Sequence, residues 1–197
     1  MTYATKHAQR TNDMTNRTPT AYWIDRAPAR ATHPKLRGHV TADLCVIGGG
    51  YTGLWTAIHA KRRNPDTRVV VLEGNTVGFA ASGRNGGFVE PSIGHGMGNV
   101  ASRWPDQARD IVRISRENFR EMERDIRELG IDCDWDESGA LCFARTQSQV
   151  ADLEAGVEEC LTYGEAAEFI GPEKIHEVTK SPAYLAAMYQ TEVATVD

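Results

Sequence analysis

The chain has 197 residues, with 22 Lys plus Arg against 27 Asp plus Glu, a net charge of -5 and 41% hydrophobic residues. This is about the length of one large domain, which can bury roughly 70% of its unfolded surface, so collagen-like, disordered and disulfide-scaffold classes are excluded. The negative charge disfavours a nucleic-acid partner. The sequence contains no run of about 18 uncharged apolar residues, so no membrane-spanning helix is predicted.

The first 20 residues are polar and lack the apolar core of a secretory signal, which predicts a flexible leader. The basic bias of the first 39 residues leaves a mitochondrial presequence as an alternative. Residues 21–39 are expected to form an arm that packs on the domain through the aromatic cluster Tyr22–Trp23–Ile24. The four cysteines contain no C-x-x-C pair and are interpreted as reduced core residues of a cytoplasmic protein.

The next segment predicts a strand, a helix and a second strand. The first strand covers residues 40–47, and its Leu44–Ile47 run suits a sheet covered on both faces. The helix covers 51–64, and the second strand covers 68–72 and ends at Glu73. Together they span about 34 residues, the size of a βαβ unit with parallel strands.

A glycine pattern joins the first strand to the helix. The run from Gly48 to Gly53 satisfies G-x-G-x-x-G, in which Gly48 permits the tight turn, Gly50 lets a pyrophosphate approach the backbone, and Gly53 lets helix and strand pack closely. The amides of Tyr51 and Thr52 and the positive end of the helix dipole then face the phosphates. The alternative is a glycine-rich turn without a ligand.

Glu73 stands at the end of the second strand, 20 residues beyond Gly53. A carboxylate there can accept hydrogen bonds from the ribose hydroxyls of adenosine. Its negative charge should repel a 2′-phosphate, which disfavours NADP. Both FAD and NAD place an ADP moiety on such a unit, so this segment does not decide between them.

The segment that follows favours FAD. Eight glycines lie between Gly74 and Gly98, and a long loop of this kind usually binds something. Its residues 78–87 offer small side chains, a hydroxyl, a guanidinium and an amide where an extended dinucleotide would continue, whereas an NAD unit more often proceeds to another crossover helix. A mobile surface turn with a solvated Arg84 is the alternative.

The second half predicts alternating helices and strands. The expected elements are a helix from Trp104–Pro105 to Leu129 that ends at Gly130, a hairpin of 133–135 and 140–144, a helix from the capping box Thr146–Gln149 to Gly164, a short helix at 165–170 and an extended stretch at 184–189. Cys133 and Cys142 flank the hairpin turn and could be neighbours, so a disulfide is the alternative, but buried thiols are expected.

The charged side chains of this half and the histidines of the whole sequence give weaker signals of function. The pairs Arg113–Glu117 and Glu123–Arg127 on the long helix indicate a solvated face. The acidic residues between 132 and 137 lack a cation-loop pattern and are expected to face water. The histidines show no metal-site spacing, and His95 in the glycine-rich loop is left as an unsupported candidate for ligand or covalent flavin contact.

These motifs together resemble a known family. The Gly48–Gly53 pattern, Glu73 and the run Ala81-Ser82-Gly83-Arg84-Asn85-Gly86-Gly87 are similar to the amino-terminal half of FAD-dependent oxidoreductases of the D-amino-acid oxidase and glycine oxidase superfamily. The Tyr22–Trp23 arm, residues 133–135 and residues 194–197 resemble one subgroup of it. The resemblance spans about residues 21–197.

The resemblance implies a flavin that takes a hydride from an amine-bearing carbon of a small amine or amino-acid substrate. It implies that Gly48, Gly50, Tyr51, Thr52 and Gly53 hold the pyrophosphate, that Glu73 holds the ribose, and that the stretch leading to the flavin ring is held by Ser82, Arg84, Asn85 and Gly86. It gives no proton-transfer catalyst and no metal.

The expected fold class is α/β, a Rossmann-like FAD-binding βαβ unit with the start of an α+β substrate domain. The expected layout is a leader over 1–20, an arm over 21–39, an FAD-binding region over 40–130 and a partial substrate domain over 131–197. Family members are considerably longer, so we expect a truncated product that lacks its carboxy-terminal half. An NAD-dependent dehydrogenase and a non-catalytic dinucleotide-binding remnant are the alternatives.

Overall fold

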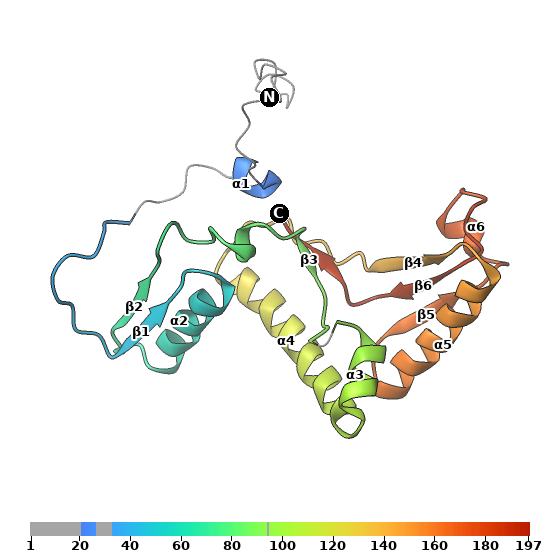
Figure 1. Cartoon of the computed structure of the whole chain (residues 1–197), viewed down its shortest axis with the longest axis horizontal. Coiled ribbons are helices and arrows are strands. Elements are labelled where there is room, and N and C mark those ends of the chain that lie inside the picture. The colour runs from blue at the N-terminus through green and yellow to red at the C-terminus, as the bar shows by residue number, and fades with distance from the viewer. Residues whose placement is uncertain (1–20, 27–32, 94) are drawn as a thin grey trace, which may run out of the picture. The chain divides into compact units, whose positions relative to one another are not determined.

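The structure is a computed structural model that describes residues 21–26, 33–93 and 95–197. The expected leader over 1–20 and residues 27–32 of the expected arm lie outside this range. The chain divides into two compact units, residues 1–85 and 86–197, which are described separately (Figure 1). The domain boundaries expected from the sequence stay a prediction.

The first unit contains the expected βαβ arrangement. β1 (Leu44–Ile47) and β2 (Val69–Leu72) pair in parallel, with Leu44 opposite Val69 and Ile47 opposite Leu72. The helix α2 (Tyr51–Arg63) connects them. The described part of the arm forms a short helix, α1 (Tyr22–Arg26). The strand–helix–strand prediction is confirmed, although the first strand is shorter than the expected 40–47.

A charged clamp joins the starts of the two strands. Arg68 donates from Nη2 to Oδ1 of Asp43 at 2.8 Å and from its backbone N to Oδ2 at 2.9 Å. The amide of Asp43 in turn donates to the carbonyl of Arg68 at 3.0 Å. Asp43 and Arg68 are therefore joined by both backbone and side-chain bonds, which help to fix the register of β1 and β2 at this end of the sheet.

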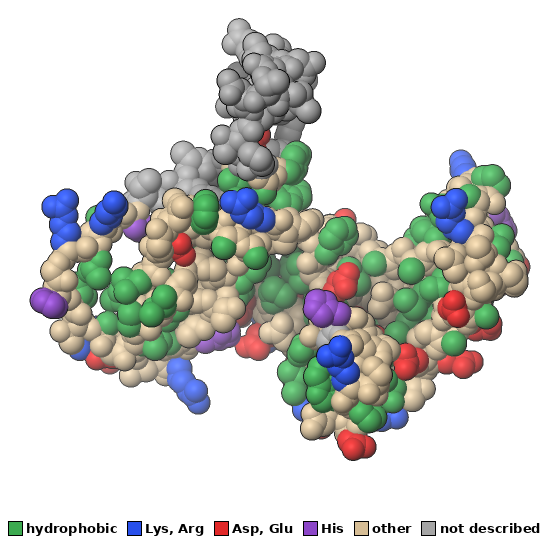
Figure 2. Space-filling view, in the orientation of Figure 1, with side chains coloured by type: hydrophobic (Ala, Val, Ile, Leu, Met, Phe, Trp, Pro, Cys, Tyr) green, Lys and Arg blue, Asp and Glu red, His purple; other side chains and the backbone are tan. Residues whose placement is uncertain are grey.

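The small sheet of the first unit keeps exposed apolar surface. Ile47 is 88% exposed, and no residue of α2 is buried. Apolar side chains are visible at the surface over the β1–α2–β2 region (Figure 2). The expected cover on both faces of this sheet is therefore not found among the described residues. Parallel sheets are normally buried on both sides, so this surface requires additional packing for full stability.

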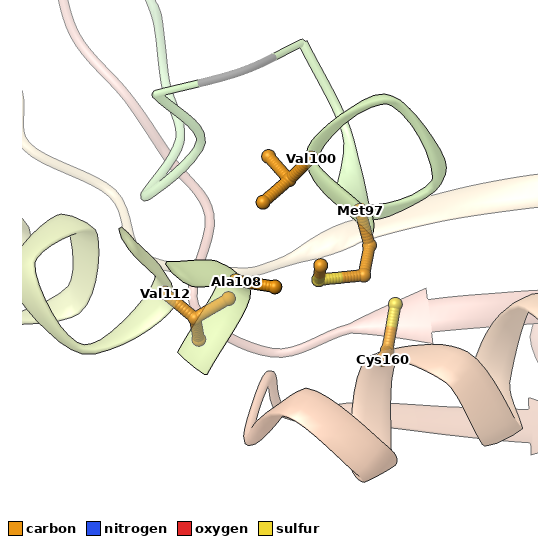
Figure 3. Close-up of a cluster of buried hydrophobic side chains, with 5 residues drawn as sticks. All are labelled: Met97, Val100, Ala108, Val112 and Cys160. Atoms are coloured by element: carbon orange, nitrogen blue, oxygen red, sulfur yellow. The ribbon is translucent and has the colours of Figure 1, made fainter. Parts of the chain in front are cut away.

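The second unit begins with helices that form a buried cluster. These are α3 (Met97–Arg103), the 3₁₀ turn η3 (Pro105–Gln107) and α4 (Ala108–Glu128). Figure 3 shows the cluster of buried side chains, which come from α3, α4 and a later helix: Met97, Val100, Ala108, Val112 and Cys160. Along α4 and its end, the apolar Leu129 is 46% exposed, while the polar Ser115 and Asp125 are buried.

A three-stranded antiparallel sheet forms the rest of the second unit. Its order is β4 (Ala140–Ala144), β6 (Ala186–Gln190), β5 (Ala167–Ile170). The helix α5 (Gln147–Tyr163) begins with the expected capping box and ends at Gly164, which has φ +94°. A short helix, α6 (Ile175–Val178), lies between β5 and β6.

A separate two-stranded ladder lies at the start and the end of this unit. β3 (Phe88–Val89) pairs antiparallel with β7 (Ala194–Thr195). The amide of Val196 also donates to the carbonyl of Gly87 at 2.8 Å. The ladder therefore ties the residues after the glycine-rich loop to the last residues of the chain.

Two expected elements of this unit are wrong. The hairpin of 133–135 with 140–144 does not form, because β4 pairs with β6 and Asp136 makes a bridge to Thr195 instead. The segment 165–170 is not a helix, because its residues 167–170 form β5 and pair with β6. In both cases the partner strand lies far along the chain, and tertiary pairing overrides local pattern.

The cysteines and the acidic cluster also differ from expectation. All four cysteines are free, as expected, but only Cys160 is buried, whereas Cys45 and Cys142 are exposed. Glu137 does not simply face water, because it pairs with Arg120 at 2.7 Å. The helix pairs Arg113–Glu117 and Glu123–Arg127 are confirmed. No helix among the described residues is long and apolar enough to cross a membrane.

Candidate functional site

The turn between β1 and α2 has the geometry that the glycine pattern predicts. Gly48 has φ +104°, a conformation that favours glycine, and its amide donates to the carbonyl of Leu72 at 2.7 Å. A Cβ on Gly53 would lie 2.0 Å from the carbonyl oxygen of Gly48 and 3.2 Å from the Val46 side chain. Only glycine at position 53 therefore permits the observed approach of helix and strand.

The first turn of α2 lies against the glycine-rich loop. Gly50 is the N-cap of α2, and a Cβ there would lie 2.9 Å from Oγ of Ser82. The amide of Tyr51 donates to the same Oγ at 3.0 Å, while Thr52 is exposed on the first turn. Backbone donors of a first helical turn have no partner within the helix, and the helix dipole adds positive potential. The basic run Lys61–Arg63 at the other end matches the dipole.

Glu73 lies against the same turn. Its Oε2 accepts a hydrogen bond from the amide of Gly49 at 2.8 Å, and its Oε1 accepts one from the amide of Asn75 at 2.8 Å. These bonds, from Gly49 first and Asn75 second, lower the pKa of Glu73 below its ordinary value. The side chain is exposed, and each carboxylate oxygen has a second lone pair for a further donor.

The loop residues 82–85 form one connected cluster. Ser82 lies in the 3₁₀ turn η2 (Ala81–Gly83). Asn85 donates from Nδ2 to the carbonyl of Ser82 at 2.7 Å and to the hydroxyl of Tyr51 at 3.1 Å. Arg84 donates from Nε to the carbonyl of Phe79 at 3.0 Å, and its guanidinium stands 5.1 Å from the centre of the Phe79 ring.

These contacts bring the predicted site residues of the first unit together. Ser82 and Asn85 both contact Tyr51, and Glu73 contacts the turn at Gly49. Arg84 is anchored within its own loop, so it is not a simply solvated side chain. Gly86 belongs to the second unit, where a Cβ on it would lie 3.3 Å from the Phe88 ring.

Three residues of this site were missed by the sequence reasoning. The amides of Gly49 and Asn75 hold Glu73, and the amide of Gly78 donates to the carbonyl of Gly49 at 2.9 Å, which fastens the loop to the turn. Gly49 occupies a free position of the G-x-G-x-x-G pattern, so the pattern gives no signal for it. A Cβ on Gly49 would lie 3.3 Å from Oε2 of Glu73.

The geometry fits the diphosphate and ribose of a dinucleotide. A Cβ added at Gly48 would meet open space, and at Gly50 the nearest side chain is the small Ser82, so no bulky group crowds these two positions. Backbone donors and a helix N-terminus suit phosphate, and an ionised carboxylate at the end of β2 suits ribose hydroxyls. Among the described residues no group of His, Cys, Asp and Glu could hold a metal ion.

A comparison with protein families identifies the class. The model of the family described as "DAO: FAD dependent oxidoreductase" matches residues 43–197. The chain therefore belongs to this family, which confirms the resemblance carried by the Gly48–Gly53 pattern, Glu73 and the Ser82–Gly87 loop. The family is FAD-dependent.

Among individual proteins, the chain is similar to gamma-glutamylputrescine oxidoreductase of Escherichia coli (strain K12). The two are 34% identical over 170 residues, which cover 85% of this chain and 39% of that enzyme. The chain thus spans about two fifths of the length of this relative. This enzyme represents the subgroup that the Tyr22–Trp23 arm and residues 133–135 and 194–197 resemble.

Two solved structures share the fold. Glycine oxidase from Bacillus cereus ATCC 14579 superposes with a TM-score of 0.61 at 20% identity, covering 79% of this chain and 40% of that one. L-Amino acid deaminase from Proteus myxofaciens gives a TM-score of 0.63 at 18% identity, covering 87% of this chain and 36% of that one. The similarity confirms the expected α/β FAD-binding fold, present here over part of the length of these proteins.

Proposed function

We propose that this chain is the amino-terminal, FAD-binding portion of an oxidoreductase that acts on a small amine or amino acid. The observation that carries the proposal is the contact between Glu73 and the glycine turn, with the Gly49 amide 2.8 Å from Oε2. It places a carboxylate beside the backbone donors of one βα corner, and that pairing suits the ribose and diphosphate of one ADP moiety.

The chain's own residues would bind and orient the cofactor. Backbone groups of Gly48, Gly50, Tyr51, Thr52 and Gly53 would lie against the pyrophosphate. The amides of Gly48 and Tyr51 already donate to Leu72 and Ser82, so the other amides of this turn would be the donors. Glu73 would accept from the ribose hydroxyls, and the negative charge that its lowered pKa maintains would repel a 2′-phosphate. Ser82, Arg84, Asn85 and Gly86 would line the path toward the flavin ring.

When bound, the flavin would supply the redox chemistry by accepting a hydride from the amine-bearing carbon of the substrate. The described residues supply binding and orientation, and we assign none of them to proton transfer. The substrate class is proposed from the relative named gamma-glutamylputrescine oxidoreductase, whose name specifies an amine compound. The remaining length of that relative makes a carboxy-terminal half the expected partner of this chain.

Flavin titration of the 197-residue chain tests the proposal. We expect FAD to bind with the absorption bands of a protein-bound flavin, and ADP to compete with it. Glu73→Gln should weaken binding by about tenfold or more, because a charge-assisted hydrogen bond contributes about 1.5–3 kcal/mol. Asp66→Asn is the matched control, because Asp66 is an exposed carboxylate in the same unit, in the turn after α2.

The outcomes separate the alternatives. A colourless protein that NAD protects from unfolding would favour an NAD-dependent dehydrogenase and contradict the proposal. A chain that binds FAD but is not reduced by amines without oxygen, even together with the carboxy-terminal half of a relative, would be a non-catalytic binding module. The cytoplasmic location and the absence of a nucleic-acid partner remain predictions from the sequence.

A further inference from the structure

A cluster of ion pairs in the second unit joins α4 to Glu192, which lies far from α4 in sequence. Glu192 lies between Arg116 and Arg120, which are four residues apart on α4. Its Oε1 accepts from Nη2 of Arg116 at 3.0 Å and from Nη2 of Arg120 at 3.1 Å, while its Oε2 accepts from Nε of Arg116. Arg116 therefore binds the carboxylate through two donors, the geometry that gives strong ion pairs.

This cluster is more enclosed than the Arg113–Glu117 ion pair of α4. The Glu192 side chain is 14% exposed, whereas the Arg113–Glu117 pair on the same helix is 56% and 63% exposed. Arg120 also binds Glu137 at 2.7 Å, and Arg116 donates to the carbonyl of Gly164 at 2.8 Å. Half-buried pairs that share partners resist solvent screening better than exposed pairs do.

The cluster lies next to the β3–β7 ladder, which follows the glycine-rich loop. Glu192 directly precedes the buried Val193 and the strand β7, and β7 pairs with β3 at Phe88 and Val89. The amide of Val196 donates to the carbonyl of Gly87 at 2.8 Å. The backbone from Gly87 to Val89 is thus held by a strand whose start is clamped to α4.

We propose that Glu192, through Arg116 and Arg120, is a positioning residue that sets the backbone of Gly86 and Gly87 by fixing β7 on α4. This inference rests on the proposed function, because Gly86 matters as the last residue of the loop assigned to the cofactor. The ion pairs of Glu192 belong to the second unit, whereas the turn at Gly48 and Glu73 belong to the first. Glu192 would act on the cofactor through the peptide groups that follow Asn85.

Hydrogen exchange of the 197-residue chain without flavin tests the positioning. We expect Glu192→Gln to speed amide exchange at residues 87–89 and 194–196 by about tenfold, while exchange in α5 stays unchanged. Glu117→Gln, which neutralises the exposed pair on the same helix, should change neither. No change at 87–89 in Glu192→Gln, or an equal rise throughout α5, overturns the proposal.

A second variant covers the case in which Glu192→Gln does not fold. Arg116→Lys keeps the charge and removes the planar fork that binds both oxygens of Glu192. It should show the same local rise in exchange with a smaller amplitude. A folded Arg116→Lys chain with no local rise contradicts the proposed role of the Glu192–Arg116 ion pair.

Flavin binding then tests the link to the cofactor. Glu192→Gln should weaken FAD binding by about fivefold, or about 1 kcal/mol, and broaden the visible bands of the bound flavin. Glu117→Gln should bind FAD within about twofold of the wild type. Faster exchange at 87–89 with unaltered FAD affinity and spectrum would overturn this link. If the wild type binds no flavin, the proposed function fails, while the exchange experiment still decides whether Glu192 holds the ladder.

Discussion

The hydroxyl of Ser82 accepts a hydrogen bond from the amide of Tyr51 at 3.0 Å, across 31 positions of the sequence. This bond fastens the loop after β2 to the first turn of α2. Because the amide supplies the proton, the hydroxyl hydrogen of Ser82 stays available for a second acceptor. Ser82 can therefore link the helix N-terminus to a phosphate oxygen.

Replacing Ser82 with Ala should weaken FAD binding by about thirtyfold, because both the loop contact to Tyr51 and a donor to phosphate are lost at about 1 kcal/mol each. Flavin titration measures the change. Ser102→Ala is the control, since Ser102 is an exposed residue of α3 that donates to the nearby carbonyl of Asn99. Equal affinities for the two variants would contradict the assignment of Ser82.

Replacing Gly53 with Ala should destabilise the first unit by about 2 kcal/mol or more, because the added Cβ would collide with the backbone of Gly48. Gly156 is the matched control, because it lies inside α5 with open space around it. Gly156→Ala should stabilise the second unit by about 0.5–1 kcal/mol.

Hydrogen exchange can follow the two units separately in these variants. Faster exchange confined to the βαβ unit is the expected result for Gly53→Ala. If both alanine variants behaved alike, the close approach of α2 to β1 would not govern stability.

Thiol labelling at pH 8 should distinguish the cysteines by position. Burial, with the Glu165 carboxylate as the second cause, raises the pKa of Cys160 to about 12, so its reactive thiolate is scarce. We expect the exposed Cys45 and Cys142 to react at least about a hundredfold faster than Cys160. Mass spectrometry of labelled peptides measures the rates, and rapid labelling of Cys160 in the folded chain would contradict the packing shown in Figure 3.

The parts of the fold that the sequence predicted well are those encoded by neighbouring residues. The G-x-G-x-x-G turn, α2 and the capping box at Thr146 depend on contacts within a few positions, and each is confirmed. The segment 167–170 reads as a helix in isolation but forms β5, because its partner in β6 lies about twenty residues further on. Local patterns carry no information on such pairing.

The site shows the same division. The pattern identifies Gly48, Gly53 and the carboxylate of Glu73, whose roles follow from a recurrent corner geometry. It cannot show that Glu73 turns back onto the Gly49 amide, because that contact depends on how the loop through Gly78 folds over the turn. The Glu192 clamp was invisible for the same reason, since its partners lie 72 and 76 positions away.

The clamp between Asp43 and Arg68 should make the first unit sensitive to acid. Hydrogen bonds from the Arg68 side chain, and next from its backbone, lower the pKa of Asp43 from 3.8 to about 2. A carboxyl whose folded pKa is depressed stabilises the fold above its unfolded pKa, and this contribution disappears as the pH falls toward the folded value. The stabilising contribution of Asp43 should therefore be complete above about pH 4 and lost near pH 2.

Thermal unfolding of the wild type and Asp43→Asn between pH 6 and pH 2 measures this contribution. The wild type should unfold at a higher temperature at pH 6, and the two curves should converge as the pH falls through the window between 4 and 2. The group is exposed, so added salt should narrow the difference at pH 6. Asp66→Asn, which removes an exposed carboxylate outside the clamp, should follow the wild type throughout. A gap between wild type and Asp43→Asn that stays constant down to pH 2 would show that Asp43 acts through packing and not through its charge.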